Sequence, residues 1–510
     1  MVALYAGTEA AVRFDTASIS GLLDGPVYDS SPTHMSVGGS GDGYRIFGGT
    51  GFTYGASGLF NGGTVTSLYI SNGTGGEPLG IVGMSMPVAT LRSYVFTSNT
   101  VGFLSAVFAG NDTLNGHSYY AFDDYLRGYN GHDAVNGGAG NDTLVGDAGN
   151  DTLNGQAGTD SLEGGAGNDN LRGGAANDFL IGGSGADTMA GGDGNDYYSV
   201  DIAGDIVTEG AGVAGGHDEV HAKITYTLSA NLEDLYLAGA AAATNGTGND
   251  SANEIGGSNF ANRLVGLGGN DSLGAGDGND TLDGGAGADE MHGASGNDTY
   301  YADWSDLVDE GVGSGIDTVI ASTDFSLSWA IGDVENLTLL AGADNLSGQG
   351  NGLANKITGN EGENNIHGFA GNDTIDGGGA TDSLNGGLGN DSLNGGIGND
   401  YVDGSHGTNT INVVSGNDTV SHSAFIDGYD IIQGFDGAAA GGQDVLDFDS
   451  MFDSLGVSAV NRAGRVQLND KGSTVDVRID TNGDGVFEYL AATLNTANTI
   501  TLGEDVVVGS

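Results

Sequence analysis

The sequence contains no cysteine and only 12 lysine and arginine residues among 510. Without cysteine, the chain can form neither disulfides nor thiolate metal sites. Neither kind of crosslink can therefore stabilise a fold whose hydrophobic core is small. The basic residues face 68 aspartates and glutamates, which gives a net charge of −56. Such a chain lacks the basic face that nucleic acid requires, and its expected partners are cations.

Aromatic residues and long apolar runs are also scarce. Only 7% of the residues are aromatic and 99 are glycine, so a large conventional core is not expected. No segment reaches the roughly 18 apolar residues of a membrane-spanning helix. The opening residues, MVALYAGTEAAVRFD, lack a basic segment followed by a long apolar run, so any export is expected to use another signal.

The sequence does contain a nine-residue repeat. Eight nonapeptides follow one another from Gly128 without a gap, among them GGAGNDTLV and GDAGNDTLN. Position six is aspartate in all eight, and position eight is always a residue that can be buried, usually leucine. The alternative interpretation, a flexible glycine-rich linker, requires neither constraint, so the register predicts an ordered structure.

Two further arrays and two similar spacers follow. The second array runs from 248 through Tyr301 and the third from 350 to 421, and both open with units that carry asparagine at position six. Segments 200–247 and 302–349 resemble each other at an offset of 102 residues, which indicates a duplicated module of spacer and array. In the first spacer, apolar residues alternate from Val220 to Leu228, as in a half-buried strand.

The two ends of the chain differ from the arrays. Residues 1–106 predict a small mixed α/β domain, with a strand at TVTSLYISN and a short helix near PVATLRSYVF, and the strand-rich residues 422–510 predict a β cap. The predicted domains are 1–106 (N-terminal domain), 107–199 (array 1), 200–247 (spacer), 248–301 (array 2), 302–349 (spacer), 350–421 (array 3) and 422–510 (C-terminal cap).

The repeat predicts both a coil and a metal. If GGxGxD forms a turn and the next three residues a strand, two units close one coil of eighteen residues. Stacking such coils at about 4.8 Å places position six of one unit beside position six two units later. A file of carboxylates repels itself unless a cation lies between successive turns. Calcium, which takes six to eight oxygen ligands, fits aspartates and bare glycine carbonyls better than magnesium or zinc does.

These residues resemble the GGxGxDxUx nonapeptide of the repeat-in-toxin (RTX) proteins, which bind calcium and are exported by type I secretion. The resemblance covers the three arrays strongly. It implies an all-β, right-handed parallel β-roll, or β-solenoid, with about a dozen calcium ions between its turns. The expected metal ligands are the position-six aspartates, Asp133, Asp142, Asp151, Asp160, Asp169, Asp178, Asp187, Asp196, Asp271, Asp280, Asp289, Asp298, Asp373, Asp382, Asp391, Asp400 and Asp418.

Nonapeptides that depart from the repeat are expected to bind calcium more weakly. Asp147 and Gln156 replace the second glycine, and Ala176 and Ala380 replace the glycine at position four. Asn409 replaces the carboxylate within array 3. We expect little calcium at the entrances of arrays 2 and 3, where asparagine also stands at position six: Asn253, Asn262, Asn355 and Asn364.

Without metal, ordering many glycines and like charges is not balanced by one leucine-sized side chain per nine residues, so the arrays are expected to fold only with calcium. Calcium is scarce inside cells and plentiful outside them, so we expect an extracellular protein. The segment GYDIIQGFDGAAAGGQDVLDFDSMF and the ending DVVVGS resemble the secretion region that type I machinery recognises, and an ordinary β cap is the alternative.

The sequence favours a non-enzymatic, secreted protein of the cell surface or matrix, such as an adhesin or a surface-layer subunit. Its possible partners are further copies of itself and cell-surface polysaccharide. The alternative is the export and folding tail of a secreted enzyme. Residues 1–106 would then be the catalytic domain, although they contain a single histidine, His34, and no recognisable metal or nucleophile set.

Three motifs suggest other chemistry. HDEVH at 217–221 resembles a zinc-protease motif, but a strand would hold His217 and His221 about 13 Å apart. GMSMP, with Ser85, lacks the last glycine of a hydrolase elbow. DTNGDGVFE at 480–488 resembles a calcium-binding EF-hand loop, yet Ala491 stands where a bidentate glutamate is required, and a hairpin turn explains the segment equally well.

Overall fold

The computed structural model describes residues 123–210, 216–237, 244–311, 315–342, 345–413 and 415–421, together with shorter segments before residue 117 and after residue 429. The chain forms two compact units, Met1–Ile255 and Gly256–Ser510. Apart from the 3-10 helix η1 (Leu327–Trp329), the regular structure of these residues consists of strands. None of it is a helix long and apolar enough to cross a membrane.

The strands of the first unit are short. They are β1 (Ala3–Tyr5), β2 (Val27–Ser31), β3 (His34–Gly38), β4 (Gly43–Phe47), β5 (Thr53–Tyr54), β6 (Phe60–Gly62), β7 (Thr64–Ile70), β8 (Leu79–Pro87), β9 (Thr113–Asn115), β10 (Tyr125–Asn130), β11 (Ala134–Ala139), β12 (Thr143–Ala148), β13 (Thr152–Ala157), β14 (Ser161–Ala166), β15 (Asn170–Ala175), β16 (Phe179–Ser184), β17 (Thr188–Asp193), β18 (Tyr197–Val200), β19 (Ile206–Val207), β20 (Glu219–Ala222), β21 (Tyr226–Thr227), β22 (Asp234–Leu237) and β23 (Gly246–Thr247). Strand β24 (Glu254–Gly256) includes the unit boundary.

The second unit has the same character. Its strands are β25 (Arg263–Gly268), β26 (Ser272–Asp277), β27 (Thr281–Ala286), β28 (Glu290–Ser295), β29 (Thr299–Ala302), β30 (Leu307–Gly311), β31 (Thr318–Ala321), β32 (Phe325–Ser326), β33 (Ile331–Gly332), β34 (Asn336–Leu339), β35 (Ser347–Gln349), β36 (Lys356–Thr358), β37 (Asn365–His367), β38 (Thr374–Asp376), β39 (Ser383–Asn385), β40 (Ser392–Asn394), β41 (Tyr401–Asp403), β42 (Thr410–Asn412), β43 (Thr419–Ser421), β44 (Asp430–Gln433), β45 (Val445–Asp447), β46 (Val466–Asp470), β47 (Thr474–Ile479), β48 (Tyr489–Asn495) and β49 (Val506–Val507).

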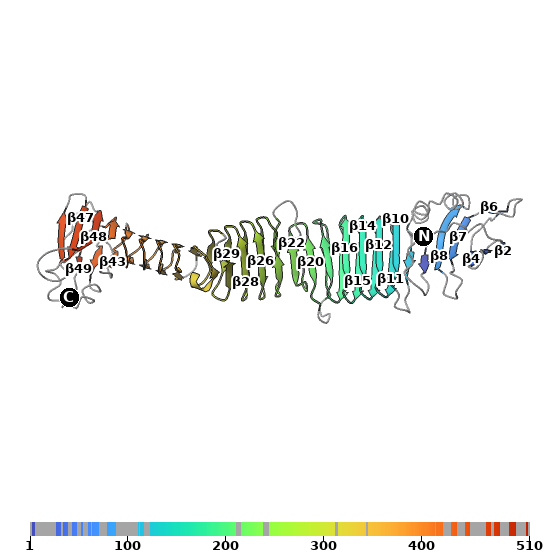
Figure 1. Cartoon of the computed structure of the whole chain (residues 1–510), viewed down its shortest axis with the longest axis horizontal. Coiled ribbons are helices and arrows are strands. Elements are labelled where there is room, and N and C mark those ends of the chain that lie inside the picture. The colour runs from blue at the N-terminus through green and yellow to red at the C-terminus, as the bar shows by residue number, and fades with distance from the viewer. Residues whose placement is uncertain are drawn as a thin grey trace. The chain divides into compact units, whose positions relative to one another are not determined.

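Each array is a stack of coils made of two nonapeptides. In array 1 even-numbered strands form one parallel sheet and odd-numbered strands another, as Figure 1 shows for β10 to β16. Leu144 of β12 pairs with Leu162 of β14, and Leu153 of β13 with Leu171 of β15, so the register advances by eighteen residues per coil. The predicted parallel β-solenoid and its coil length are confirmed.

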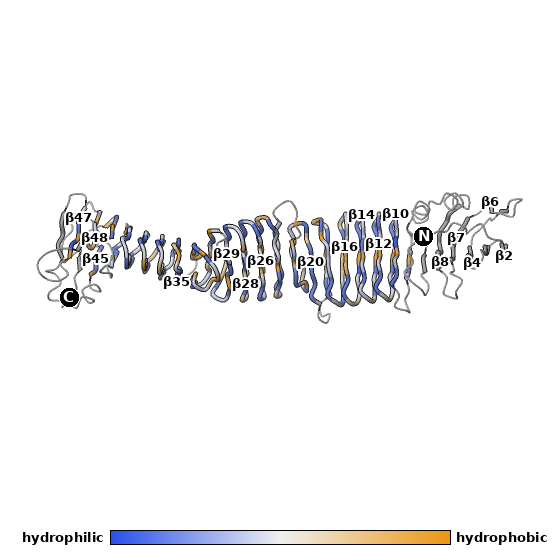
Figure 2. Tube along the Cα trace, viewed as in Figure 1, coloured by the Kyte–Doolittle hydropathy of each residue, from blue (hydrophilic) through white to orange (hydrophobic). Residues whose placement is uncertain are grey.

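The core of the solenoid is a narrow internal stack of position-eight side chains. Leu144, Leu153, Leu162 and Leu171 are fully buried. Figure 2 shows hydrophobic and hydrophilic residues alternating along the coils. This alternation follows from the strand period of two, which turns one side chain of each strand inward and its neighbours outward.

The strands differ in length between arrays. Array 3 has the expected three-residue strands, such as Thr374–Asp376 in β38. In arrays 1 and 2 most strands have six residues, because pairing continues through the first three residues of the next nonapeptide. Asp147 of β12, for example, pairs with Gly165 of β14.

The spacers extend the solenoid with coils of variable length. In the first unit, Val220 of β20 pairs with Tyr198 of β18 and with Leu235 of β22, and all three side chains are fully buried. The single strand expected from Val220 to Leu228 is instead two strands, β20 and β21. The side chain of Ile224, between them, is only partly buried, so the alternation does not continue through the turn.

Antiparallel strands adjoin the solenoid in each unit. In the first, β7 pairs with β8, β8 with β1, and β1 in parallel with β9. In the second, β46, β47 and β48 form an antiparallel group, and β48 pairs in parallel with β44. The strand expected in TVTSLYISN is β7. Of the segment PVATLRSYVF, where a helix is expected, only Pro87 is described, as the last residue of β8, and the other residues lie outside the described ones.

Candidate metal centres

The position-six aspartates lie in files, joined by hydrogen bonds from coil to coil. The backbone N–H of Asp142 donates to Oδ1 of Asp160 at 2.7 Å, and that of Asp160 donates to Oδ1 of Asp178 at 2.7 Å. The same eighteen-residue bond recurs in arrays 2 and 3, for example between Asp280 and Asp298 at 2.6 Å. All seventeen predicted aspartates are buried, with at most 3% of the residue exposed.

The second carboxylate oxygen of most of these aspartates has no hydrogen-bond partner. Leaving such an oxygen buried and unsatisfied costs about 1 to 3 kcal/mol, and more when it is charged. The Oδ2 atoms concerned belong to Asp142, Asp151, Asp160, Asp169, Asp178, Asp187, Asp196, Asp280, Asp289, Asp298, Asp373, Asp382, Asp391 and Asp400. This repeated oxygen is an acceptor for something other than a protein donor.

The first glycine of a nonapeptide leaves space next to this oxygen. A Cβ added to Gly146 would lie 2.5 Å from both Oδ2 of Asp151 and the carbonyl oxygen of Gly164, one coil further on. At Gly377 the corresponding distances are 2.6 Å to Oδ2 of Asp382 and 2.5 Å to the oxygen of Gly395. A carboxylate oxygen and a carbonyl oxygen therefore converge where the glycine has no side chain.

Burial makes these carboxylates costly as bare anions. Desolvation raises the pKa of Asp142 to about 7, an effect partly offset by the hydrogen bond from the backbone of Asp124. Desolvation likewise raises the pKa of Asp178 to about 8, and the charges of Asp160 and Asp196 add to it. Stacked carboxylates with raised pKa values require protons or cations in this fold.

The donor set fits calcium. It consists of buried carboxylate oxygens and glycine carbonyl oxygens, which are the hard ligands that Ca²⁺ prefers. The chain offers no thiolate ligand, because it has no cysteine. Bound calcium supplies the positive charge that successive carboxylates lack, while the chain's own N–H groups hold each Oδ1 in place.

Asparagine at position five has a role that the sequence analysis did not assign. Oδ1 of Asn141 accepts from the backbone N–H of Thr159 at 2.9 Å, and Oδ1 of Asn150 accepts from that of Asn168 at 3.0 Å. This exposed ladder runs beside the buried aspartate ladder with the opposite direction of donation. The frequent Asn-Asp pair therefore provides two links between neighbouring coils.

The carboxylate files continue beyond the predicted ligands into the spacers. The N–H of Asp187 donates to Asp205, that of Asp196 to Asp218, and that of Asp218 to Glu233. In the second unit the corresponding acceptors are Asp306, Asp317 and Glu335. Array 3 continues to Asp430 and Asp444. The regular nine-residue step misses these residues, but DIVTE at 205–209 and DLVDE at 306–310 recur in both spacers and were a usable signal.

The side-chain amides of the asparagines at the array entrances form hydrogen bonds that need no cation. Nδ2 of Asn355 donates to the carbonyl oxygen of Glu335 at 3.1 Å, and Oδ1 accepts from the N–H of Asn351 at 2.8 Å. Nδ2 of Asn364 donates in the same way to the oxygen of Leu346 at 3.1 Å. An amide supplies the proton donor that a carboxylate lacks, and low calcium occupancy at these coils stays a prediction.

The two histidines of HDEVH contact different groups. Strand β20 extends through His221, whose ring lies 4.7 Å from the ring of Tyr197 and 5.3 Å from that of Tyr236. His217 pairs instead with Asp234 at 2.9 Å. Neither histidine belongs to the acidic groups that the described residues bring within metal-binding distance.

The other two motifs remain predictions. Ser85 lies on strand β8, and no side chain of that strand is described. The loop at 480–488 lies outside the described residues, while Ala491, which follows it, is fully buried.

The geometry agrees with a comparison against known families. The sequence model of one family, described as the RTX calcium-binding nonapeptide repeat (4 copies), matches residues 120–144, 137–171, 163–198, 246–282, 256–290, 265–300, 349–384 and 385–420. These matches cover all three arrays. A search of curated proteins finds no match to this chain.

Proposed function

Because the chain carries RTX calcium-binding nonapeptide repeats, we propose that it is an extracellular protein whose arrays fold when they bind calcium. The observation that carries the proposal is the set of buried Oδ2 atoms without a partner, which recur every nine residues along the chain and every eighteen within each file. In the absence of metal each coil adds desolvated carboxylates to the file and gains only a thin leucine core. In its presence, binding free energy becomes folding free energy.

A chain that is unfolded without calcium and folds when it binds calcium is suited to export. RTX repeats are typical of proteins secreted by type I systems, which supports passage through that machinery as an unfolded chain. Residues 422–510 are the proposed secretion region. Deletion of residues 451–510 is expected to abolish secretion, and normal export of the truncated protein would refute this assignment.

The finished solenoid is proposed to act structurally, as a surface or matrix protein rather than an enzyme. Support comes from the first unit, where Phe179 and Tyr197 of array 1 and His221 and Tyr236 of the spacer form a row across β16, β18, β20 and β22, with ring centroids 4.7 to 5.6 Å apart. Phe179 is 49% exposed. Rings in such a row can stack against another copy or against the sugar rings of a cell-surface polysaccharide.

The folding proposal is tested by titrating the chelated full-length protein with calcium and recording far-UV circular dichroism. The expected result is a cooperative gain of β signal that a chelator reverses. A chelated protein that already has its full β signal would overturn the proposal.

Assembly is a separate question that electron microscopy of the calcium-loaded protein answers. Sheets or fibres that form with calcium, and weaken when Phe179 and Tyr197 are replaced by serine, would support the structural role. A strict monomer at millimolar calcium would count against self-assembly. Hydrolytic activity that survives removal of the arrays and maps to residues 1–106 would favour the alternative of an enzyme with an RTX tail.

A further inference from the structure

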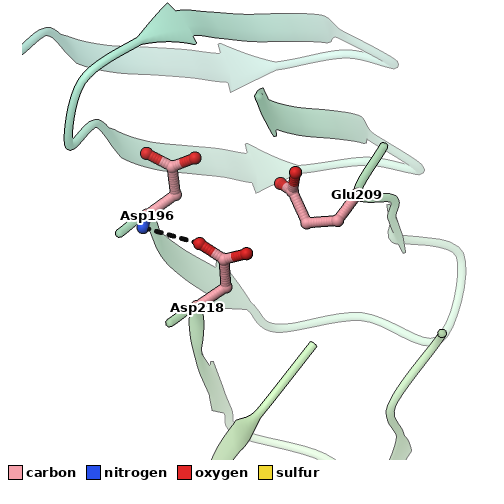
Figure 3. Close-up of side chains that lie close together, drawn as sticks. All are labelled: Asp196, Glu209 and Asp218. Carbon is pink, nitrogen blue, oxygen red and sulfur yellow. Dashed lines mark hydrogen bonds between the residues drawn. The ribbon is translucent and has the colours of Figure 1, made fainter. Parts of the chain in front are cut away.

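Three carboxylates come together where array 1 meets its spacer. Asp196 is the last position-six aspartate of the array, and Glu209 and Asp218 belong to the spacer. One oxygen from each lies within 4.8 Å of the others. Figure 3 shows the three carboxylates around a common space. Asp196 and Asp218 are buried, and Glu209 is half-buried.

The second unit repeats this cluster at the end of array 2. Asp298, Glu310 and Asp317 again lie with one oxygen each within 4.8 Å, and all three are buried. The spacers have different lengths between these residues, yet the fold brings the same three chemical groups together. The cluster is therefore a property of the duplicated module.

The protein holds the carboxylates in place from the outside. Oδ1 of Asp218 accepts from the N–H of Asp196, and Oδ1 of Asp317 from the N–H of Asp298, both at 2.8 Å. Oε1 of Glu209 accepts from the N–H of Gly191 at 3.0 Å.

Each glutamate also accepts from a buried tyrosine. The hydroxyl of Tyr198 donates to Glu209, and that of Tyr300 donates to Glu310. Both tyrosines occupy position eight, where other nonapeptides have leucine, and both are fully buried. The larger side chain at this position places a fixed donor beside the cluster.

One oxygen in each cluster points into the space without a partner. Oδ2 of Asp196 and Oδ2 of Asp298 are buried and make no hydrogen bond. A Cβ added to Gly293 would lie 2.5 Å from Oδ2 of Asp298 and 2.9 Å from Oε1 of Glu310. The unpartnered oxygen thus faces the glutamate. Three carboxylates in one small volume repel each other unless a cation joins them.

The glutamate replaces the carbonyl ligand of an ordinary coil. Within the array, the space beside Gly146 is approached by the carbonyl oxygen of Gly164, eighteen residues later. Eighteen residues after Gly191, the first residue of the last nonapeptide, the chain has Glu209 instead of a glycine. Beside Gly293, at the end of array 2, Oε1 of Glu310 is among the nearest atoms, so a charged side chain lies where an ordinary coil has a neutral carbonyl.

The geometry points to a dedicated calcium site at the end of each of arrays 1 and 2, formed by Asp196, Glu209 and Asp218 and by Asp298, Glu310 and Asp317. These sites differ from the nonapeptide sites in having a third carboxylate. Their all-oxygen, strongly anionic ligand set selects a hard divalent cation. Each ion would fasten the irregular spacer coil to the last regular coil of its array.

Replacing both glutamates by glutamine tests the inference. Glutamine keeps an acceptor for Tyr198 and Tyr300 but removes one charge from each cluster. Equilibrium dialysis of the full-length protein with radioactive calcium is expected to find that two ions per chain bind about tenfold more weakly in E209Q/E310Q. Glu163→Gln and Glu290→Gln, both on exposed strand positions, are matched controls that should bind as many ions as the unmodified protein.

An E209Q/E310Q protein that binds all of its ions as tightly as the unmodified protein would overturn the inference. The result is separable from the calcium-folding proposal, because the nonapeptide sites of the variant remain and should still fold the arrays. If even the unmodified protein binds no calcium, the folding proposal and this inference both fail.

Terbium provides a second measurement that does not depend on the glutamine variant. Tyrosine transfers excitation to a bound terbium ion only at short range, and Tyr198 and Tyr300 contact the proposed ligands. Tyr198→Phe together with Tyr300→Phe is expected to remove a large part of the tyrosine-sensitised emission, whereas Tyr236→Phe, whose hydroxyl bonds Glu254, should not. Equal emission from the double variant and the Tyr236 control would contradict the assignment.

Discussion

At the scale of single residues, a nonapeptide separates three tasks. Aspartate at position six links neighbouring coils through Oδ1 and leaves Oδ2 for metal. Asparagine at position five forms a second, exposed link. Glycine at position one keeps open the space where the oxygens converge, and a side chain there would compete with the ion.

Gly146→Ala tests the importance of that space. The added Cβ would lie 2.5 Å from Oδ2 of Asp151, too close for both to stay in place. Ala275 stands at position one of a nonapeptide in array 2, so the variant is expected to fold. We expect calcium binding at this coil to weaken about tenfold, or about 1.4 kcal/mol, by calorimetric titration. Gly274→Ala is the control, since nothing lies within 4 Å of its Cβ. Equal effects of the two substitutions would refute this account.

Ala176 has a backbone conformation that glycine adopts more easily. Its φ is 77°, and that of Ala380 at the same position of array 3 is 67°. A left-handed conformation costs a residue with a Cβ roughly 1 to 2 kcal/mol. Ala176→Gly is therefore expected to stabilise the calcium-bound protein by about 0.5 to 1 kcal/mol in urea unfolding, after the entropy cost of glycine is subtracted. Ala190 is the control, because its φ lies outside the left-handed region, and Ala190→Gly should destabilise the protein. If Ala190→Gly also increased stability, backbone strain at Ala176 would not explain the effect.

The raised carboxyl pKa values predict how the metal-free protein responds to pH. Burial raises the pKa of Asp142 to about 7 and that of Asp178 to about 8 in the folded state. The folded state then binds more protons than the unfolded state, whose aspartates titrate near 4. Stability is therefore highest below about pH 4 and is lost as the pH rises towards 8. In chelator, circular dichroism should show more β structure at about pH 5 than at about pH 8. A β signal that rises with pH would contradict this.

At the scale of strands and coils, the stack of position-eight side chains is the apolar part of the stability. Leu162 on β14 is fully buried, whereas Ile181 on β16 is 42% exposed. Leu162→Ala is expected to cost about 2 to 5 kcal/mol, because narrow coils cannot collapse around the cavity. Ile181→Ala should cost less than about 0.5 kcal/mol. Urea unfolding at saturating calcium measures both. Similar losses would mean that metal ligation dominates and that the stack contributes little.

The elements that could be predicted from the sequence are those in which the nine-residue repeat is constant. The nine-residue step placed Leu144 and Leu162 in one sheet and Asp142 beside Asp160. It could not place Glu209 and Asp218, because spacer coils vary in length and the step from Asp196 to Asp218 is twenty-two residues. The lengths of the strands in arrays 1 and 2 could not be predicted from the nine-residue step either, because the pairing of Asp147 with Gly165 depends on neighbouring coils rather than on local propensity.

For the whole molecule, the question is whether calcium acts as a ligand or only as a neutralising salt. With a net charge of −56 the unfolded chain repels itself, and about 1 M sodium chloride shortens the screening length to roughly 3 Å. Screening relieves exposed charges but does not supply a partner to the buried Oδ2 of Asp151 or Asp169. Magnesium requires a stricter octahedron and retains its water.

Sodium chloride and magnesium are therefore expected not to fold the chelated protein, whereas millimolar calcium should fold it. The measurement is far-UV circular dichroism of one preparation under the three conditions, with sedimentation velocity to record compaction. The unfolded chain is expected to sediment more slowly in the first two conditions than with calcium. If sodium chloride alone restored the β signal, repulsion between exposed carboxylates would be the barrier to folding, and the buried oxygens would need no ion.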